Sequence, residues 1–124
     1  MIAYPKRIFN AVTLTAAYAD NTGSRIDVRA AGCITILGSY TTGATETNNT
    51  CNIQIEYSPD GSTWWPVSTT EDIAGAAAST NYKNDPQLLS INANYIRFSA
   101  KETGVAANFG TLTLYVIFSG KAGA

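Results

Sequence analysis

The chain has 124 residues, of which 45% are hydrophobic and 14% charged, and its formal net charge at pH 7 is −1. This length suffices for one domain with its own core, and the small net charge argues against the basic surface on which nucleic-acid binding depends. No apolar run approaches the roughly 18–20 residues that a membrane span requires. A surface so poor in charge does not repel copies of itself, which favours packing into an assembly.

The N-terminal residues 1–8 are predicted to form an extended arm. Ile2, Tyr4 and Pro5 are the residues of this arm expected to contact a neighbouring molecule, and two basic residues follow them. The segment lacks the apolar run of a secretory signal, so we expect a protein that is made in the cytoplasm.

Most of residues 9–120 alternate between apolar and polar side chains, which is the pattern of β-strands with one buried face. The clearest example is 51–58, where Cys51, Ile53 and Ile55 fall on one face. In chain order, strands are predicted at 9–18, 24–30, 32–40, 51–58, from 64 onward, and at 87–91, 94–101 and 111–120.

Segments rich in Gly, Asn, Asp and Pro separate these strands and are predicted to be turns. They are 19–24, 41–49, 58–62, 73–80, 84–86 and 102–110. Segment 68–78 can hold one helical turn capped by Thr70, although Gly75 favours a loop. Short strands between such turns predict one all-β domain at 9–120, an antiparallel β-sandwich or jelly roll of about eight strands. Residues 121–124 are predicted to be a C-terminal tail.

The two cysteines, Cys33 and Cys51, are too few for a disulfide framework or a metal cage. Both fall in predicted strands with apolar residues at alternate positions, which favours buried, reduced thiols. A single bridge between adjacent strands is the alternative, and it requires the two Cα atoms to lie within about 7 Å of each other.

The sequence contains no histidine, which removes the commonest general base, the Ser-His and Cys-His pairs, and most transition-metal sites. Most of the nine Asp and Glu residues fall at predicted turns, and their spacing indicates neither a glycosidase pair nor a calcium loop. A glycine-rich phosphate loop followed by a helix is also absent. The sequence therefore predicts no enzyme activity, no metal and no cofactor.

The segment IQIEYSPDGSTWWPV (53–67) predicts a β-hairpin, because its Pro-Asp-Gly favours a tight turn between two strands. Trp64 and Trp65 begin the return strand, and adjacent residues of a strand point to opposite faces. One indole is then expected in the core opposite Ile55 or Tyr57. The other is expected to be covered by the protein's own loops, by a neighbouring subunit or by a sugar. Adjacent tryptophans on one strand cannot form one flat platform, which counts against the sugar.

This hairpin resembles a pattern of small virion proteins of tailed bacteriophages. In that pattern an alternating strand ends in Ser-x-Asp-Gly-x-x-Trp, and a later strand like YIRF precedes a terminal apolar one. The corresponding segments here are NANYIRFSA (92–100) and GTLTLYVIFSG (110–120), so the resemblance covers residues 51–120. It implies a β-sandwich component of the capsid or tail, often a head-decoration protein placed as trimers or as single knobs on the shell.

The same two segments also resemble discoidin-type jelly rolls, which have a YS-x-DG-x-x-W hairpin and an RYIR strand. That resemblance implies binding to glycans or lipid head groups. The family's N-terminal Asp-Gly-x-x-x-Thr-x-Trp and Asp-Leu-Gly segments are absent from this chain, and the chain is short for the family.

Together these observations predict a non-enzymatic virion protein, most specifically a capsid decoration protein. Its expected partners are the major capsid protein and other copies of itself, with no nucleic acid and no membrane. The N-terminal arm and one of the two tryptophans are the expected contacts. The alternatives are a carbohydrate-binding jelly-roll module on a tail fibre or a secreted protein, and a structural component of the tail or neck.

Overall fold

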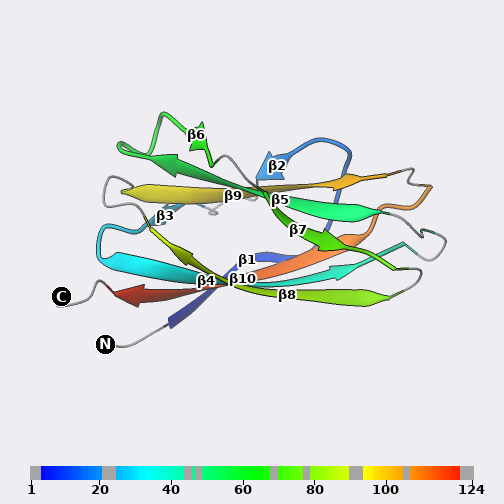
Figure 1. The fold of residues 1–124 in the computed structure, drawn as a ribbon. Helices are drawn as coiled ribbons and strands as arrows, with labels where there is room; N and C mark the ends of the chain where they lie inside the picture. Colours follow the sequence, from blue (N-terminus) through cyan, green and yellow to red (C-terminus); the bar gives the residue numbers. More distant parts are fainter. Residues whose placement is uncertain are drawn as a thin grey trace.

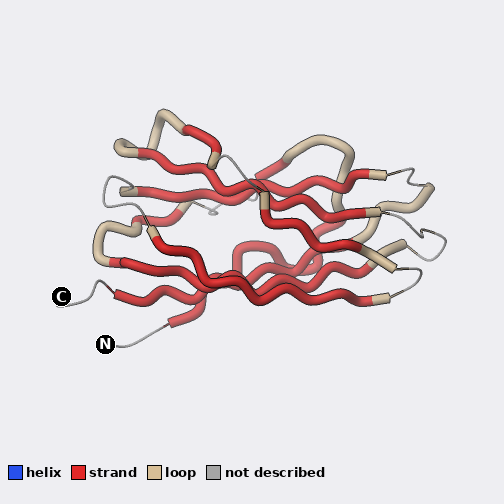
Figure 2. Tube along the Cα trace, in the orientation of Figure 1, coloured by secondary structure: helices blue, strands red, loops and turns tan. Residues whose placement is uncertain are grey.

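The computed structural model describes residues 4–20, 25–43, 46, 49–67, 70–76, 79–89, 94–104 and 107–120. Within these residues the regular structure consists of ten β-strands (Figure 1, Figure 2). They are β1 (Tyr4–Thr13), β2 (Ala19–Asp20), β3 (Ile26–Asp27), β4 (Ala31–Thr41), β5 (Thr50–Ser58), β6 (Trp65–Pro66), β7 (Glu71–Ala74), β8 (Thr80–Leu88), β9 (Tyr95–Thr103) and β10 (Thr111–Gly120). The prediction of an all-β chain is confirmed.

The strands form two antiparallel sheets that face each other (Figure 1). Sheet A has the strand order β1-β10-β4-β8. Sheet B has the order β2-β9-β5-β6, with β3 also paired to β9 and β7 also paired to β5. The predicted antiparallel β-sandwich is therefore confirmed, and β4 and β5, which follow each other in the sequence, belong to different sheets.

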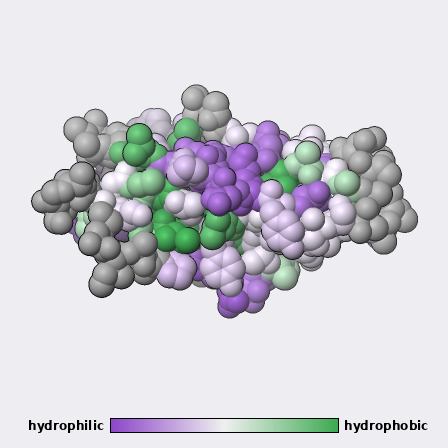
Figure 3. All heavy atoms as spheres, turned by 60° about the horizontal axis from the view of Figure 1, so that its bottom comes forward, coloured by the Kyte–Doolittle hydropathy of each residue, from purple (hydrophilic) through white to green (hydrophobic). Residues whose placement is uncertain are grey.

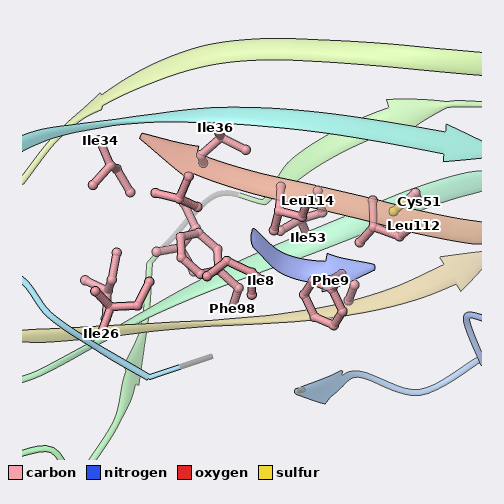
Figure 4. Packing of buried hydrophobic residues seen from close by; sticks show 14 of the residues in the cluster. Ile8, Phe9, Ile26, Ile34, Ile36, Cys51, Ile53, Phe98, Leu112 and Leu114 are labelled. Atoms are coloured by element: carbon pink, nitrogen blue, oxygen red, sulfur yellow. The ribbon is translucent and has the colours of Figure 1, made fainter. Parts of the chain in front are cut away.

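The core lies between the two sheets and is built from alternate residues of the long strands. Figure 4 shows side chains from β4 and β10, such as Ile36 and Leu114, meeting Ile53 of β5 and Phe98 of β9. Each large apolar side chain that is fully buried contributes on the order of 1.5–3 kcal/mol relative to an exposed one. The period of two in the sequence places these residues on the inward face of each strand, and the sandwich follows from burying both faces together.

At the N-terminus the structure differs from the prediction. Residues 4–8 are not a separate arm, since β1 starts at Tyr4 and pairs with β10, where Tyr4 lies opposite Phe118. Ile8 is buried in the core. Pro5 is exposed on this edge strand, where a missing N–H costs no sheet hydrogen bond. Ile2 and the predicted tail at 121–124 lie outside the described residues.

Two further local predictions were wrong. The predicted turn at 84–86 lies inside β8, because β8 is the edge of sheet A and an edge strand tolerates Pro86. In segment 68–78, the loop that Gly75 favoured and the alternative of one helical turn are both replaced at Glu71–Ala74 by β7, which pairs with β5. Both errors have the same cause: turn-forming residues are acceptable in short or peripheral strands that need fewer backbone hydrogen bonds.

Candidate binding surfaces

The outer face of sheet A is uncharged along three adjacent strands. Antiparallel register places residues that lie opposite each other on the same face, so Tyr115 of β10, Leu37 of β4 and Asn84 of β8 form one row across the sheet. The outward positions are Cys33, Thr35, Leu37, Ser39 and Thr41 in β4, Thr111, Thr113, Tyr115, Ile117 and Ser119 in β10, and Thr80, Tyr82, Asn84, Pro86 and Leu88 in β8. None of these described positions carries a charge, and Arg7 of β1, opposite Tyr115, lies at the rim.

Large apolar side chains are exposed on this face. Leu88 is 85% exposed and Tyr82 is 79% exposed, and Tyr115 is also exposed. A shallow hollow of about 390 Å³ is lined by Tyr82 and Tyr115, together with Leu37, Gly38, Ser39, Lys83, Asn84 and Thr113. Leu88 lies outside it, opposite Cys33 of β4. Figure 3, which brings the sheet A side forward, shows hydrophobic (green) atoms gathered in the left half of this view, beside hydrophilic (purple) atoms across its middle. Tyr82 and Tyr115 are exposed around the same hollow, and large apolar side chains exposed together mark an interaction surface more often than scattered ones do.

The outer face of sheet B has the opposite character. Its outward positions include Gln54 and Glu56 of β5, Arg97 and Ser99 of β9, and Asp20 of β2. A polar hollow of about 130 Å³ is lined by Tyr18 together with these five residues. The two outer faces of the sandwich thus differ: the outward positions of β4, β10 and β8 are uncharged and include exposed large apolar side chains, whereas the outer face of sheet B carries charged side chains.

An ion pair organises the polar face. The guanidinium group of Arg97 donates to the carboxylate of Glu56 through Nε at 2.9 Å and Nη2 at 3.3 Å. The ring of Trp64 lies against the same guanidinium, with 4.6 Å between Cζ and the ring centroid. A planar guanidinium held by a two-point carboxylate contact and an aromatic ring has little freedom to move.

Neither tryptophan enters the core, contrary to the prediction. Trp64 contacts Arg97 on the outer face of sheet B. Trp65 lies opposite Tyr57 and so points to the inward side, but it is 56% exposed. The reason is that β6 is the edge strand of sheet B, where an inward-pointing side chain can lie beyond the cover of the opposite sheet. The predicted opposite orientation of the two side chains agrees with this geometry.

The hairpin that carries the tryptophans is held by local hydrogen bonds. Asp60 Oδ1 accepts the backbone N–H groups of Ser62 and Thr63, each at 2.8 Å, and the hydroxyl group of Ser58 at 3.0 Å. The N–H groups of Thr63 and Ser62 and the Ser58 hydroxyl lower the pKa of Asp60 from its usual value of 3.8, since all three favour the carboxylate. Gly61 has φ = 77°, a conformation that glycine adopts without steric cost.

The two thiols are free and lie in different sheets, Cys33 in β4 of sheet A and Cys51 in β5 of sheet B. The alternative of a bridge between adjacent strands is therefore not realised. Cys51 is fully buried, and burial, with a smaller effect of the Glu102 carboxylate, raises its pKa to about 12. Cys33 is only half-buried, on the outer face of sheet A.

Two kinds of site are not found in the part of the chain that the structure describes. Those residues contain no cluster of three or more Cys, Asp or Glu side chains that could hold a metal ion. They also contain no helix with the length and hydrophobicity to cross a membrane.

Comparison with known proteins supports the fold. No protein-family model matches the chain, and no curated protein matches it. Among solved structures, the chain is similar to the globular domain of zebrafish complement 1qA protein, with 9% identity, a TM-score of 0.52 and 94% of each chain covered. It also matches a structure described as "Bacillus endospore appendages form a novel family of disulfide-linked pili", with 17% identity, a TM-score of 0.41, and 95% of this chain and 88% of that chain covered.

The first of these similarities shows a shared jelly-roll β-sandwich fold. At such low sequence identity it shows the fold alone, and the second similarity is too low to carry an argument. Neither structure is a phage virion protein. The fold is thus established as an antiparallel β-sandwich, and the resemblance to phage virion proteins rests on the sequence segments alone.

Proposed function

We propose that this protein is a non-enzymatic structural component of a phage virion, most specifically a capsid decoration protein that docks through the outer face of sheet A. The observation that carries the proposal is the difference between its two outer faces. The uncharged face, with Leu88 and Tyr82 exposed, is suited to contact with a partner, whereas the polar face of sheet B is suited to water.

The energetics of such docking are favourable for this face. Covering exposed apolar surface contributes about 25 cal/mol per Å². Because the outward positions of β4, β10 and β8 carry no charge and Arg7 lies at the rim, docking through these three strands avoids the large cost of removing unpaired charges from water. Many copies bound to one shell stabilise it together even when each contact is modest. Pro5 of β1 lies opposite Ile117 and extends the same face, so the N-terminal residues remain expected contacts.

The proposed partners are the major capsid protein and other copies of this chain, arranged on the shell as trimers or as single knobs, with no nucleic acid and no membrane involved. The protein would be made in the host cytoplasm and reside in the virion. A tail or neck component would use the same face in the same way. A gene position beside a major capsid protein gene would favour the head.

The test is binding of the recombinant protein to empty, expanded capsids of the source phage. We expect co-sedimentation with the capsids and a rise in their melting temperature. Leu88→Ser and Tyr82→Ser should each weaken binding, because both side chains are exposed on the docking face. Trp65→Ser is the matched control, since it removes an exposed aromatic side chain of sheet B.

Two results would contradict the proposal. The first is no gain in capsid stability on adding the wild-type protein. The second is loss of binding with Trp65→Ser but not with the two sheet A variants, which would place the contact on the wrong side of the sandwich.

A further inference from the structure

The polar hollow on the outer face of sheet B has the size of a shallow saccharide subsite. It lies where β2, β9 and β5 run side by side, on the side of the molecule opposite sheet A (Figure 1). Its volume of about 130 Å³ is well below the roughly 300–1,000 Å³ of pockets that enclose drug-sized ligands. A depression of this size can receive one edge of a single sugar ring but cannot enclose a nucleotide or a large cofactor.

Hydrogen-bond donors in the hollow are fixed in place and only partly used. Arg97 has five N–H donors, and its Nε and Nη2 groups donate hydrogen bonds to the carboxylate of Glu56. The ring of Trp64 lies against its guanidinium group. The remaining N–H groups of Arg97 have no hydrogen-bond partner among the described residues. Gln54 accepts a weak hydrogen bond of 3.4 Å from the Ser99 hydroxyl through Oε1, and its Nε2 has no hydrogen-bond partner among the described residues.

One acceptor in the hollow is also unused. Asp20 lies opposite Ser99 in the β2–β9 pair and lines the hollow, and its carboxylate has no hydrogen bond or ion pair with any described residue. An aromatic wall is present as well, since Tyr18 lines the hollow; the ammonium group of Lys101 lies over this ring, 4.6 Å from its centroid. Tyrosine rings present an apolar surface beside a polar edge.

The charges select the class of ligand. The charge of Arg97 is balanced by Glu56 at hydrogen-bond distance, and the ammonium group of Lys101, which lies against the Tyr18 ring, offsets the carboxylate of Asp20. The charges in and around the hollow therefore nearly cancel. Phosphate, sulfate and acidic sugars gain no net electrostatic attraction from such a balanced set of charges. A neutral ligand with adjacent hydroxyl groups fits, because each hydroxyl both donates and accepts a hydrogen bond.

We propose that this hollow is a binding site for a neutral saccharide. Asp20 accepts from its hydroxyl groups, Arg97 and Gln54 donate to them, and Tyr18 packs against the ring. The inference goes beyond the proposed function and does not depend on it. The two are compatible, because docking through sheet A leaves the face of sheet B in solvent, where many weak sites on one particle act together.

The test is a titration of the isotope-labelled full-length protein with neutral methyl glycosides of glucose, galactose, mannose and N-acetylglucosamine, followed by NMR chemical-shift changes of backbone amides. We expect shifts at residues 20, 54, 97 and 99 with at least one of these sugars, and a dissociation constant on the order of 1 mM, as for a shallow site with few contacts. Asp20→Ala and Gln54→Ala should each weaken binding about tenfold. Asn84→Ala, on the outer face of sheet A, is the control and should bind as the wild type does.

Three results would overturn the proposal. One is the absence of shifts with all four sugars at concentrations far above 1 mM. Another is binding that Asp20→Ala and Gln54→Ala both leave unchanged. The third is stronger binding of inorganic phosphate or sialic acid than of any neutral sugar at the same residues. None of these results would affect capsid docking, which is tested with sheet A variants.

Discussion

The hydroxyl group of Tyr40 in sheet A donates a hydrogen bond of 2.7 Å to Oε1 of Glu102 in sheet B, and both side chains are buried. Glu102 also accepts from Asn49 Nδ2 at 2.9 Å and from the backbone N–H of Gly110 at 2.8 Å. Nearby, buried Glu46 accepts the backbone N–H groups of Ala107 and Asn108. These donors satisfy the buried carboxylates and tie the two sheets and their connecting loops together.

Tyr40→Phe removes the hydroxyl donor and leaves the buried carboxylate of Glu102 with one partner fewer. We expect the free energy of unfolding to fall by about 1–3 kcal/mol, measured by urea denaturation at neutral pH. Tyr82→Phe is the control, because Tyr82 is exposed and its hydroxyl group has no hydrogen bond among the described residues. Equal stability of the two variants would show that the bond between the sheets contributes nothing.

This cluster illustrates what the sequence could not reveal. Tyr40 and Glu102 are 62 positions apart, and sequence reasoning treated Glu102 as one of the carboxylates at turns. Only the pairing of β9 with β5, and the packing of that sheet on β4, brings the two side chains together. Periodicity reports which face of a strand is buried, but it carries no information about which strands face each other across the core.

The two thiols should differ in reactivity. Cys51 is buried and its pKa is raised to about 12, so very little thiolate is present near neutral pH. Cys33 is half-buried on the outer face of sheet A. We expect N-ethylmaleimide to label Cys33 in the native protein and Cys51 only after unfolding, as read by peptide mass spectrometry. Labelling of both at similar rates, or recovery of a Cys33–Cys51 disulfide from freshly purified protein, would contradict the arrangement of the strands.

The hairpin should contribute stability that is lost in acid. Because the pKa of Asp60 is lower in the folded protein than its usual value of 3.8, the unfolded state takes up the proton first as the pH falls. The contribution of Asp60 is therefore complete above pH 3.8 and declines as the pH falls through the lowered pKa. Asp60→Asn should reduce the melting temperature at neutral pH and flatten its decline below about pH 4.

The control for the hairpin is Asp20→Asn, which changes a carboxylate without a hydrogen-bond partner among the described residues. It should leave the melting temperature and its decline in acid close to those of the wild type. If the melting temperatures of wild type and Asp60→Asn declined by the same amount as the pH fell, the hydrogen bonds of Asp60 would not depend on its charge.

The hairpin also shows where sequence reasoning succeeds and where it stops. Ser58, Asp60 and Gly61 specify the turn by contacts with their immediate neighbours, and β5 and β6 pair as the sequence predicts. The fate of Trp64 and Trp65 depends instead on whether another sheet covers them. The sequence predicted that the two side chains point to opposite faces. It could not predict that neither enters the core, because that follows from β6 being an edge strand.

The two binding surfaces were also only partly predictable from the sequence. The sequence shows outward Thr and Ser in the strands that form sheet A, but Leu88 and Tyr82 join that face only because β8 continues through Pro86. The polar hollow unites Asp20, Gln54 and Arg97 from three strands. No local signal links these residues, since each reads alone as an ordinary solvent-facing position.

The open edge between β7 and β8 should give the protein a second, opposite pH dependence. Glu71 is buried there, with Lys83 Nζ at 3.1 Å from Oε2 and Gln87 Nε2 at 2.6 Å from Oε1. Burial, together with the neighbouring Asp85, raises the pKa of Glu71, while Lys83 opposes this effect. A raised pKa means that the folded state binds the proton more tightly, so this group's contribution is present at low pH and is lost as the pH rises through the raised pKa.

Lys83→Met keeps much of the apolar stem of Lys83 but removes the cation that favours the Glu71 carboxylate. The pKa of Glu71 should then rise further, and the variant should lose more stability at about pH 7.5 than at about pH 4, where the carboxyl group is largely protonated. Thermal unfolding at the two pH values gives the comparison. Lys6→Met, which removes an exposed charge on β1, is the control and should have a small effect at both. A loss for Lys83→Met that is the same at both pH values would indicate that Lys83 acts through packing of its stem and not through its charge on Glu71.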